Sequence, residues 1–480
     1  MNSKYTHLSI SLLCKIGINI LVVFYVASQL SIQDFGSFSL AFVFSALFIS
    51  IFDYGLNLKS LTLAGSKVTE VRKTLSSMVL VKGTIVILVF IVFLIFLKFS
   101  SYSAYTKTAI LILGLSAIPI SFGNFYLNSF KILDNFKKEA TGNFIQVAFI
   151  IGGIALNHFY GKADAIYFAW IIALARIVYF IYAMISYNNQ FRLTINSTLS
   201  EAVQLAKKAT PFAIHFILSS FIIYIDTFVL SFLATMEDVG TYQAAMRIIM
   251  AAMLISIIVS DAFIPEVSSS KKNVEAVRVK MIKLFEFLIL FASLAILSVY
   301  FFKSTIIQLL FSDAYLVLNS FMLYIISIIF LRYIGIVPGI ILTSLDKQSV
   351  RAVAVIASVV VSILLNIILI PRLGIEGAFI ASLIAHLVLN AIYMFKSYEV
   401  VPFVTSGKNY LFIISSLLLV YFIIAKFLDD NITSMAISIL LSLATIIAYA
   451  NFAQLKTYLK SNYKTSVSYT HLTLPTTPYV

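Results

Sequence analysis

Five cationic side chains inside long apolar runs are the residues of this sequence best suited to do chemistry. They are Lys15, Lys82, Arg176, Arg247 and Arg332. A Lys or Arg at the centre of a membrane-spanning helix costs about 2.5–3.5 kcal/mol on insertion scales, so such a side chain faces protein or a water-filled cavity rather than lipid. Cations around a cavity suit an anionic substrate, and the planar fork of Arg can bond two oxygens of a phosphate. We therefore predict that these five residues bind the anionic part of a substrate.

Four carboxylates also lie in the apolar runs. Asp226 lies well inside the run 211–233, and it is our candidate for binding a coupling ion, either a proton or sodium. Asp53, Asp261 and Glu286 lie near the cytoplasmic ends of their runs. We expect these three to be solvated there or to balance loop cations.

Some of these charges have a purely structural alternative. Arg247 and Asp226 lie at a similar depth on adjacent spans, so they are also expected as a structural ion pair. Lys15 and Lys82 lie in the cytoplasmic half of their spans, where a lysine can extend its amine to the membrane interface.

The sequence offers no pattern for metal, thiol or cofactor chemistry. Its single cysteine, Cys14, lies in an apolar run, and its five histidines are dispersed without metal-ligand spacing. We predict no catalytic residue, no metal site and no cofactor.

Composition places most of the chain in lipid. Of its 480 residues, 61% are hydrophobic and 11% are charged, whereas soluble domains have about 45–50% apolar and roughly 25% charged residues. The net charge of +14 does not indicate nucleic-acid binding, because the lysines and arginines are scattered between the apolar runs.

The apolar runs predict an all-α membrane protein with fourteen transmembrane helices, each about 20 residues long. The expected spans are 8–30, 36–57, 76–97, 108–129, 141–159, 164–187, 210–233, 240–263, 281–302, 317–341, 351–371, 375–396, 409–427 and 432–454. Of the 34 lysines and arginines, 23 fall on one side of the membrane and 6 on the other, which places both termini in the cytoplasm.

An internal repeat divides these spans into two halves. The turn DFGSF at 34–38 returns as DVGTY at 238–242. Two further pairs of glycines keep the same order at a similar offset, Gly123 with Gly335 and Gly161 with Gly374. Chance matching of short glycine patterns is the alternative. We predict two six-helix bundles related by a pseudo-two-fold axis along the membrane normal, a MATE-like arrangement with a cavity between the bundles.

The linker between the halves carries a helix signature. Thr198-Leu-Ser-Glu201 fits a capping box, which predicts an amphipathic helix on the membrane surface rather than a solvated linker. The last fifteen residues, SVSYTHLTLPTTPYV, resemble a translated sequencing adaptor, so we exclude them from fold reasoning. The expected segments are the N-terminal bundle at 1–187, the linker at 188–209, the C-terminal bundle at 210–397, helices 13 and 14 at 398–465, and the artefact at 466–480.

The chain resembles the Wzx-type flippases that export O-antigen or capsule repeat units. They belong to the MOP exporter superfamily, together with MATE multidrug transporters and lipid II flippases. The resemblance extends to about Leu459 and depends on LSIQDFGSFSL at 30–40, DYGL at 53–56, Asp226, VGTYQAAMR at 239–247, Asn366 and PRLGIEGA at 371–378.

This resemblance implies a transporter that is not an enzyme, in the bacterial cytoplasmic (inner) membrane. It implies flipping of undecaprenyl-diphosphate-linked oligosaccharide from the cytoplasmic to the outer leaflet by alternating access, for O-antigen or capsular polysaccharide synthesis. The five cations would meet the diphosphate or an anionic glycan. The lipid bilayer, a polymerase and a chain-length regulator of the same pathway are the implied partners.

Two other functions stay open from the sequence. A cation-coupled multidrug exporter of the same fold would need a carboxylate-rich cavity, whereas mid-span charge here is mostly positive. A membrane glycan polymerase or ligase would need a large outer loop, and the expected outer loops are short.

Overall fold

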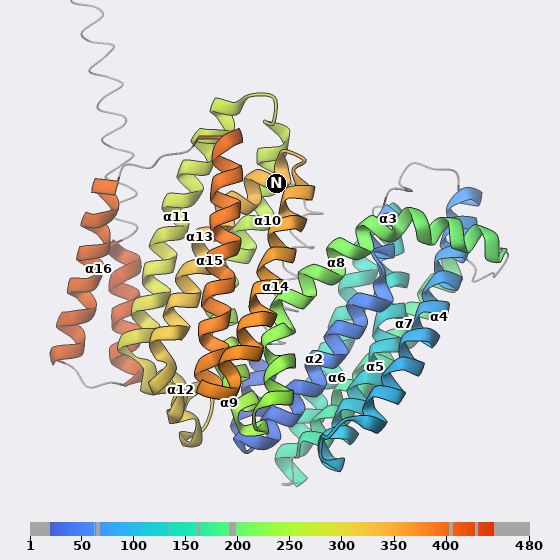
Figure 1. Cartoon of the computed structure of the whole chain (residues 1–480), viewed down its shortest axis with the longest axis horizontal. Helices are drawn as coiled ribbons and strands as arrows, with labels where there is room; N and C mark the ends of the chain where they lie inside the picture. The colour runs from blue at the N-terminus through green and yellow to red at the C-terminus, as the bar shows by residue number, and fades with distance from the viewer. Residues whose placement is uncertain are drawn as a thin grey trace, which may run out of the picture.

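The chain folds into two helical lobes joined by one long helix (Figure 1). A computed structural model describes residues 20–61, 63, 68–133, 135–160, 164–191, 198–402, 407–427 and 431–445. Within these ranges all regular structure is helical. The first lobe holds α2 (Ile32–Asp53), α3 (Leu56–Leu61), α4 (Val68–Phe99), α5 (Ala104–Asn128), η1 (Ser129–Leu133), α6 (Lys137–Tyr160) and α7 (Ala165–Phe191).

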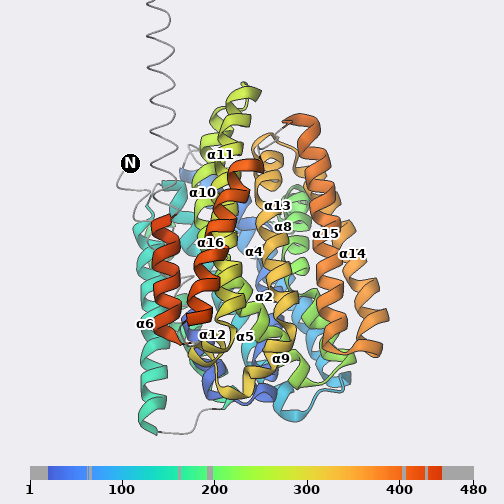
Figure 2. The ribbon, with the colours of Figure 1, turned by 90° about the vertical axis from the view of Figure 1, so that its left-hand side faces the viewer.

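The second lobe is built from the later helices. They are α9 (Met236–Ala252), α10 (Leu254–Ser269), α11 (Val274–Phe301), α12 (Lys303–Leu310), η2 (Asp313–Phe321), α13 (Met322–Ser344), α14 (Gln348–Leu373), α15 (Ile375–Val400) and α16 (Gly407–Phe427). Seen from the side of this lobe, α16 lies at its flank along α11 (Figure 2). There the hydroxyl groups of Tyr421 and Ser298 are 2.5 Å apart.

The predicted all-α membrane architecture is confirmed. Nine helices of the described part are long and apolar enough to cross a bilayer, and shorter apolar helices include Ile20–Gln29 and Ile432–Thr445. Two expected spans, 8–30 and 432–454, extend beyond the described residues. The count of fourteen therefore stays a prediction.

The two lobes diverge toward one end of the molecule and meet at the other (Figure 1). We call the open end the basic end, because the start of α4, which carries Lys73, and the turn between α10 and α11, which carries Lys271, lie there (Figure 1). These lysines belong to the loops that the charge count assigns to the cytoplasm.

The joining helix, α8 (Leu199–Leu233), has the predicted capping box at its start. The Thr198 side chain accepts a hydrogen bond from the Glu201 backbone, and the Glu201 side chain accepts one from the Thr198 backbone. However, the expected boundary at residue 210 lies inside α8. The first turns cross the basic end of the first lobe, and the same helix then descends between the lobes (Figure 1).

One expected span is interrupted. The run 240–263 forms two helices, α9 and α10, which part at Met253. The Tyr333 hydroxyl donates a 2.8 Å hydrogen bond to the carbonyl of Ala252. A side chain that inserts into the backbone hydrogen-bond ladder is an established cause of a helix break. Because Tyr333 lies far from Ala252 in the sequence, the sequence did not predict this break.

At the closed end, the two repeated turns lie against each other. A Cβ built on Gly36 would overlap the carbonyl oxygen of Met236, and one built on Gly240 would overlap that of Ile32. The contact is reciprocal between the two halves of the predicted repeat. Only glycine allows the first turns of α2 and α9 to approach this closely.

Candidate functional site

Two arginines from opposite lobes approach the same aromatic ring. The guanidinium carbon of Arg176, on α7, lies 5.8 Å from the centroid of the Phe42 ring, and that of Arg247, on α9, lies 5.6 Å from it. Both arginines are largely buried, with 5% and 8% of their surface exposed. The ring of Phe42, on α2, stabilises each of these cations.

Neutral groups hold Arg176 in position. Its Nη1 donates to the hydroxyl oxygens of Ser45, at 2.6 Å, and Ser116, at 2.8 Å. Among the described residues no carboxylate pairs with this guanidinium. The hydroxyl groups satisfy donors and leave the charge uncompensated.

Arg247 has weaker neutral partners. Its Nη2 lies 3.4 Å from Oε1 of Gln243, and its Nη1 lies 3.5 Å from the Met250 sulfur. Its Nε is buried without a hydrogen-bond partner among the described atoms. Leaving a buried charge unpaired costs several kcal/mol. An anion placed beside Arg176 and Arg247 would therefore be strongly favoured.

Asp226 does not pair with Arg247, so the structural ion pair is not formed. Its Oδ2 accepts a 3.0 Å bond from the Tyr242 hydroxyl. Its Oδ1 accepts bonds from Ser362, at 2.5 Å, and from the amide nitrogen of Asn366, at 2.7 Å. All three partners can donate, which fits an ionised carboxylate that only accepts.

The surroundings of Asp226 offer further oxygen. Oδ1 of Asn366 is buried without a hydrogen-bond partner in the described part of the chain. Asp226 also interacts electrostatically with Arg332 on α13. This cluster joins α8, α9 and α14, and a proton or cation bound there would change how they pack.

Arg332 faces a separate cavity of the second lobe. The cavity has a volume of about 300 Å³ and is also lined by Arg351, which is not among the predicted site residues. Arg332 Nε donates a 3.2 Å hydrogen bond to Nε2 of His386.

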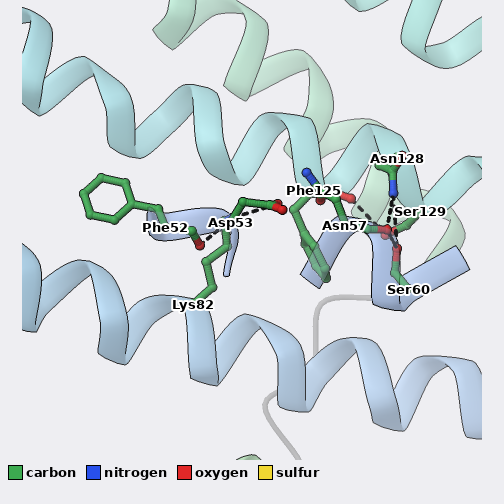
Figure 3. A network of polar contacts seen from close by, with 8 residues as sticks. All are labelled: Phe52, Asp53, Asn57, Ser60, Lys82, Phe125, Asn128 and Ser129. Carbon is green, nitrogen blue, oxygen red and sulfur yellow. Dashed lines mark hydrogen bonds and ion pairs between the residues drawn. The ribbon is translucent and has the colours of Figure 1, made fainter. Parts of the chain in front are cut away.

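Lys82 lies in a closed network rather than at a cavity (Figure 3). Its Nζ donates a 3.0 Å bond to the carbonyl of Phe52 and lies 4.0 Å from Oδ1 of Asp53. None of its surface is exposed. In this conformation Lys82 neither faces a substrate nor extends to the interface. The last carbonyls of α2 carry partial negative charge, which favours a cation here.

Asp53 is buried as well, and the cation beside it is Lys82 of α4, so it is neither solvated nor balanced by a loop cation as expected. It ends α2, where Tyr54 and Gly55 adopt positive φ angles of 48° and 69° and turn the chain into α3. Of the remaining predicted residues, Glu286 is exposed. Lys15 and the side chain of Asp261 lie outside the described residues.

Several residues of the site were not predicted as ligands. Phe42, Ser45 and Ser116 carry no signal in an apolar chain. Ser362 and Asn366 are four positions apart, a spacing that places two polar side chains on one face of a helix. This spacing is the one sequence signal from which part of the Asp226 cluster could have been predicted.

Comparisons with known proteins support this architecture. The sequence profile of the family described as polysaccharide biosynthesis protein matches residues 3–271, more than half of the chain. A probable low-salt glycan biosynthesis flippase, Agl15 of Haloferax volcanii, is 28% identical over 179 residues. That alignment covers 36% of this chain and only 37% of the relative's length.

Solved structures share the fold. The lipid II flippase MurJ, in an inward closed conformation, matches with a TM-score of 0.74 at 18% identity, over 94% of this chain and 99% of that one. An inward-facing multidrug MATE family transporter of the MOP superfamily matches with a TM-score of 0.66 at 12% identity, over 82% and 97%. The expected MATE-like fold is confirmed.

Proposed function

The chain belongs to the polysaccharide biosynthesis protein family, and we propose that it flips a lipid-linked glycan across the bilayer by alternating access. The observation that carries this proposal is the pair Arg176 and Arg247. They come from opposite lobes, both lie beside the Phe42 ring, and neither has a carboxylate partner among the described residues. An anionic head group recruited there would contact both moving halves at once.

The substrate that fits best is an oligosaccharide repeat unit on undecaprenyl diphosphate, destined for O-antigen or capsule. In this role the diphosphate accepts hydrogen bonds from Arg176 and Arg247. The lipid tail remains in the bilayer. Lys15 is retained as a further contact of the diphosphate, Arg332 faces a cavity of its own, and Lys82 acts within the first lobe.

The shape of the molecule supports alternating access. The lobes are apart at the basic end and closed at Gly36 and Gly240. With the basic end in the cytoplasm of a bacterial inner membrane, this is an inward-facing state. Loading neutralises the arginines, and the glycine contact then separates to release the glycan on the other side.

Asp226 is the proposed coupling site. Binding of a proton or a sodium ion would weaken or replace its bonds to Tyr242, Ser362 and Asn366. The unpartnered Oδ1 of Asn366 would supply a second oxygen to a cation. Because these donors come from α9 and α14, ion binding would bias the packing of the second lobe.

A transporter is favoured over an enzyme. The relatives named above are a flippase of glycan biosynthesis, a lipid II flippase and a multidrug transporter. The two central charges are cationic, which favours an anionic glycan carrier over the cationic drugs of an exporter.

The test compares lipid-linked intermediates in the two leaflets. Cells lacking the gene are complemented with wild-type protein or with Arg176→Gln or Arg247→Gln. We expect the variants to accumulate intermediates in the cytoplasmic leaflet and to lose surface glycan. Exposed Arg372, in the last turn of α14, gives the matched control Arg372→Gln, which should complement fully. Equal complementation by all variants would refute the role of the pair.

A further inference from the structure

We infer that the cavity of the second lobe is a separate binding site for an anionic group, a phosphate or a sugar carboxylate, of the transported molecule. This inference rests on the proposed function in one respect, namely that the anionic group belongs to the transported glycan carrier. The cavity measures about 300 Å³ and lies among α8, α13, α14 and α15. Neither Arg176 nor Arg247 lines it.

The charge of the cavity is positive. Arg332 and Arg351 line it, and none of its lining residues is Asp or Glu. Arg332 does interact with Asp226, but that carboxylate is already bonded to three neutral donors. Within the described residues no hydrogen bond joins the terminal nitrogens of Arg332 to a protein acceptor. An anion in the cavity would supply the missing acceptor.

His386 fixes the direction of Arg332. Its Nδ1 lies 2.8 Å from the carbonyl oxygen of Ser382, which can only accept, so Nδ1 carries the proton. Nε2 of the neutral ring then accepts from Arg332 Nε at 3.2 Å. This neutral tautomer holds the guanidinium by one edge and leaves its other donors directed away from the ring.

Arg351 is held at the other end of the cavity, nearer the basic end. Its Nη1 donates a 2.6 Å bond to the hydroxyl of Thr343, and its guanidinium carbon lies 6.0 Å from the ring centroid of Tyr393. Thr343 follows Arg332 by eleven positions on α13, a rise of about 16 Å. Both arginines therefore reach into one elongated cavity, which suits an extended anionic ligand entering from the basic end.

A local reporter can test occupancy of this site. In the full chain with Cys14→Ala, Val355→Cys places a thiol on the cavity wall. The reporter is reconstituted in nanodiscs, and the rate of its modification by a small neutral thiol reagent is measured. Pyrophosphate, galacturonate and neutral galactose are compared at matched ionic strength. We expect one or both anions, but not galactose, to slow modification.

Removal of either guanidinium should abolish the protection. In the reporter background, Arg351→Gln and Arg332→Gln should weaken the protecting anion about tenfold or more, because each removes charge-assisted hydrogen bonds. Arg372→Gln is the control and should retain protection. If Arg332→Gln fails to fold, Arg351→Gln decides, since its side chain is half-buried at the start of α14.

The outcomes separate the two proposals. Protection by pyrophosphate alone assigns the diphosphate to this cavity, and protection by galacturonate alone assigns an acidic sugar. Protection by neither anion, or protection that survives Arg351→Gln, overturns the inference. Loss of leaflet transfer in Arg247→Gln with no anion effect on the Val355→Cys reporter would leave the proposed function standing without this site. Conversely, normal leaflet transfer in Arg247→Gln together with anion protection of the Val355→Cys reporter would support the binding site and refute the proposed role of Arg247.

Discussion

Adding one methyl group at Gly240 should force open the closed end of the molecule. In Gly240→Ala the new Cβ would lie 3.0 Å from both the carbonyl carbon and Cγ2 of Ile32, and it would overlap the carbonyl oxygen. Ordinary contacts of a Cβ begin at about 3.4 Å, so α2 and α9 must part by at least 0.4 Å and by more at the oxygen. Overpacking of this kind costs typically about 1–3 kcal/mol. The cost applies only to the conformation in which this end is closed.

The expected population shift is about 5- to 150-fold toward states in which α2 and α9 are apart. Thr241 reports on it, because its side chain is buried in the closed structure. With Thr241→Cys in a Cys14→Ala background, the rate of modification by a hydrophilic thiol reagent should rise by that factor. Gly36→Ala should act in the same direction, since its contact is the reciprocal one.

Gly83→Ala is the matched control, because the Cβ it would add lies more than 4 Å from every described atom other than its chain neighbours and the nearby backbone of its own helix. Its labelling rate should equal that of the parent reporter. A lowered melting temperature without any change in labelling would mean that Gly240→Ala merely destabilises the fold. That result would refute the assignment of this contact as the one that holds the closed end together.

Three further outcomes are expected. Asp226→Asn should remove the dependence of flipping on a proton or sodium gradient, measured in proteoliposomes, and unchanged dependence would exclude this residue as the coupling site. Lys82→Met should destabilise the protein by about 3–5 kcal/mol, because it leaves Asp53 buried and unpaired. The melting temperature should fall, and adding Asp53→Asn should partly restore it. An unchanged melting temperature would contradict the pairing. The Lys73 amine, with the backbone of Thr198, lowers the pKa of Glu201 below its ordinary 4.5. The Glu201 carboxylate therefore contributes to stability above about pH 4.5, and this contribution is lost as the pH falls below that value. The measurement is the melting temperature against pH for wild type and Glu201→Gln, and parallel curves across this pH range would rule the contribution out.

Local signals in the sequence were sufficient for the fold class and for several elements. Apolar runs fix the membrane helices because a bilayer requires their length and composition. The capping box at Thr198 and Glu201 forms as predicted, since all its atoms lie within four residues. The repeat singled out Gly36 and Gly240, although it could not show that the two glycines meet.

Long-range partners account for what the sequence did not show. The break at Met253 depends on Tyr333, and the burial of Lys82 depends on the end of α2, about 30 positions away. Neither partner is visible in a window of neighbouring residues. Arg351 was not predicted as a site residue, because it lies only three residues after the start of α14. Its place at the cavity depends on Thr343 of α13 and Tyr393 of α15.

Because α8 is continuous, the number of residues in it fixes how its first turns, on the first lobe, are rotated relative to its last turns, in the second lobe. Glu201 and Asp226 are 25 positions apart on one helix, a rise of about 38 Å. Inserting a single residue between them would rotate one end relative to the other by about 100°. Asp226 would then turn away from Ser362 while the capping box stayed in place. The number of residues between Glu201 and Asp226 is therefore itself a determinant of the contacts that Asp226 makes with α9 and α14.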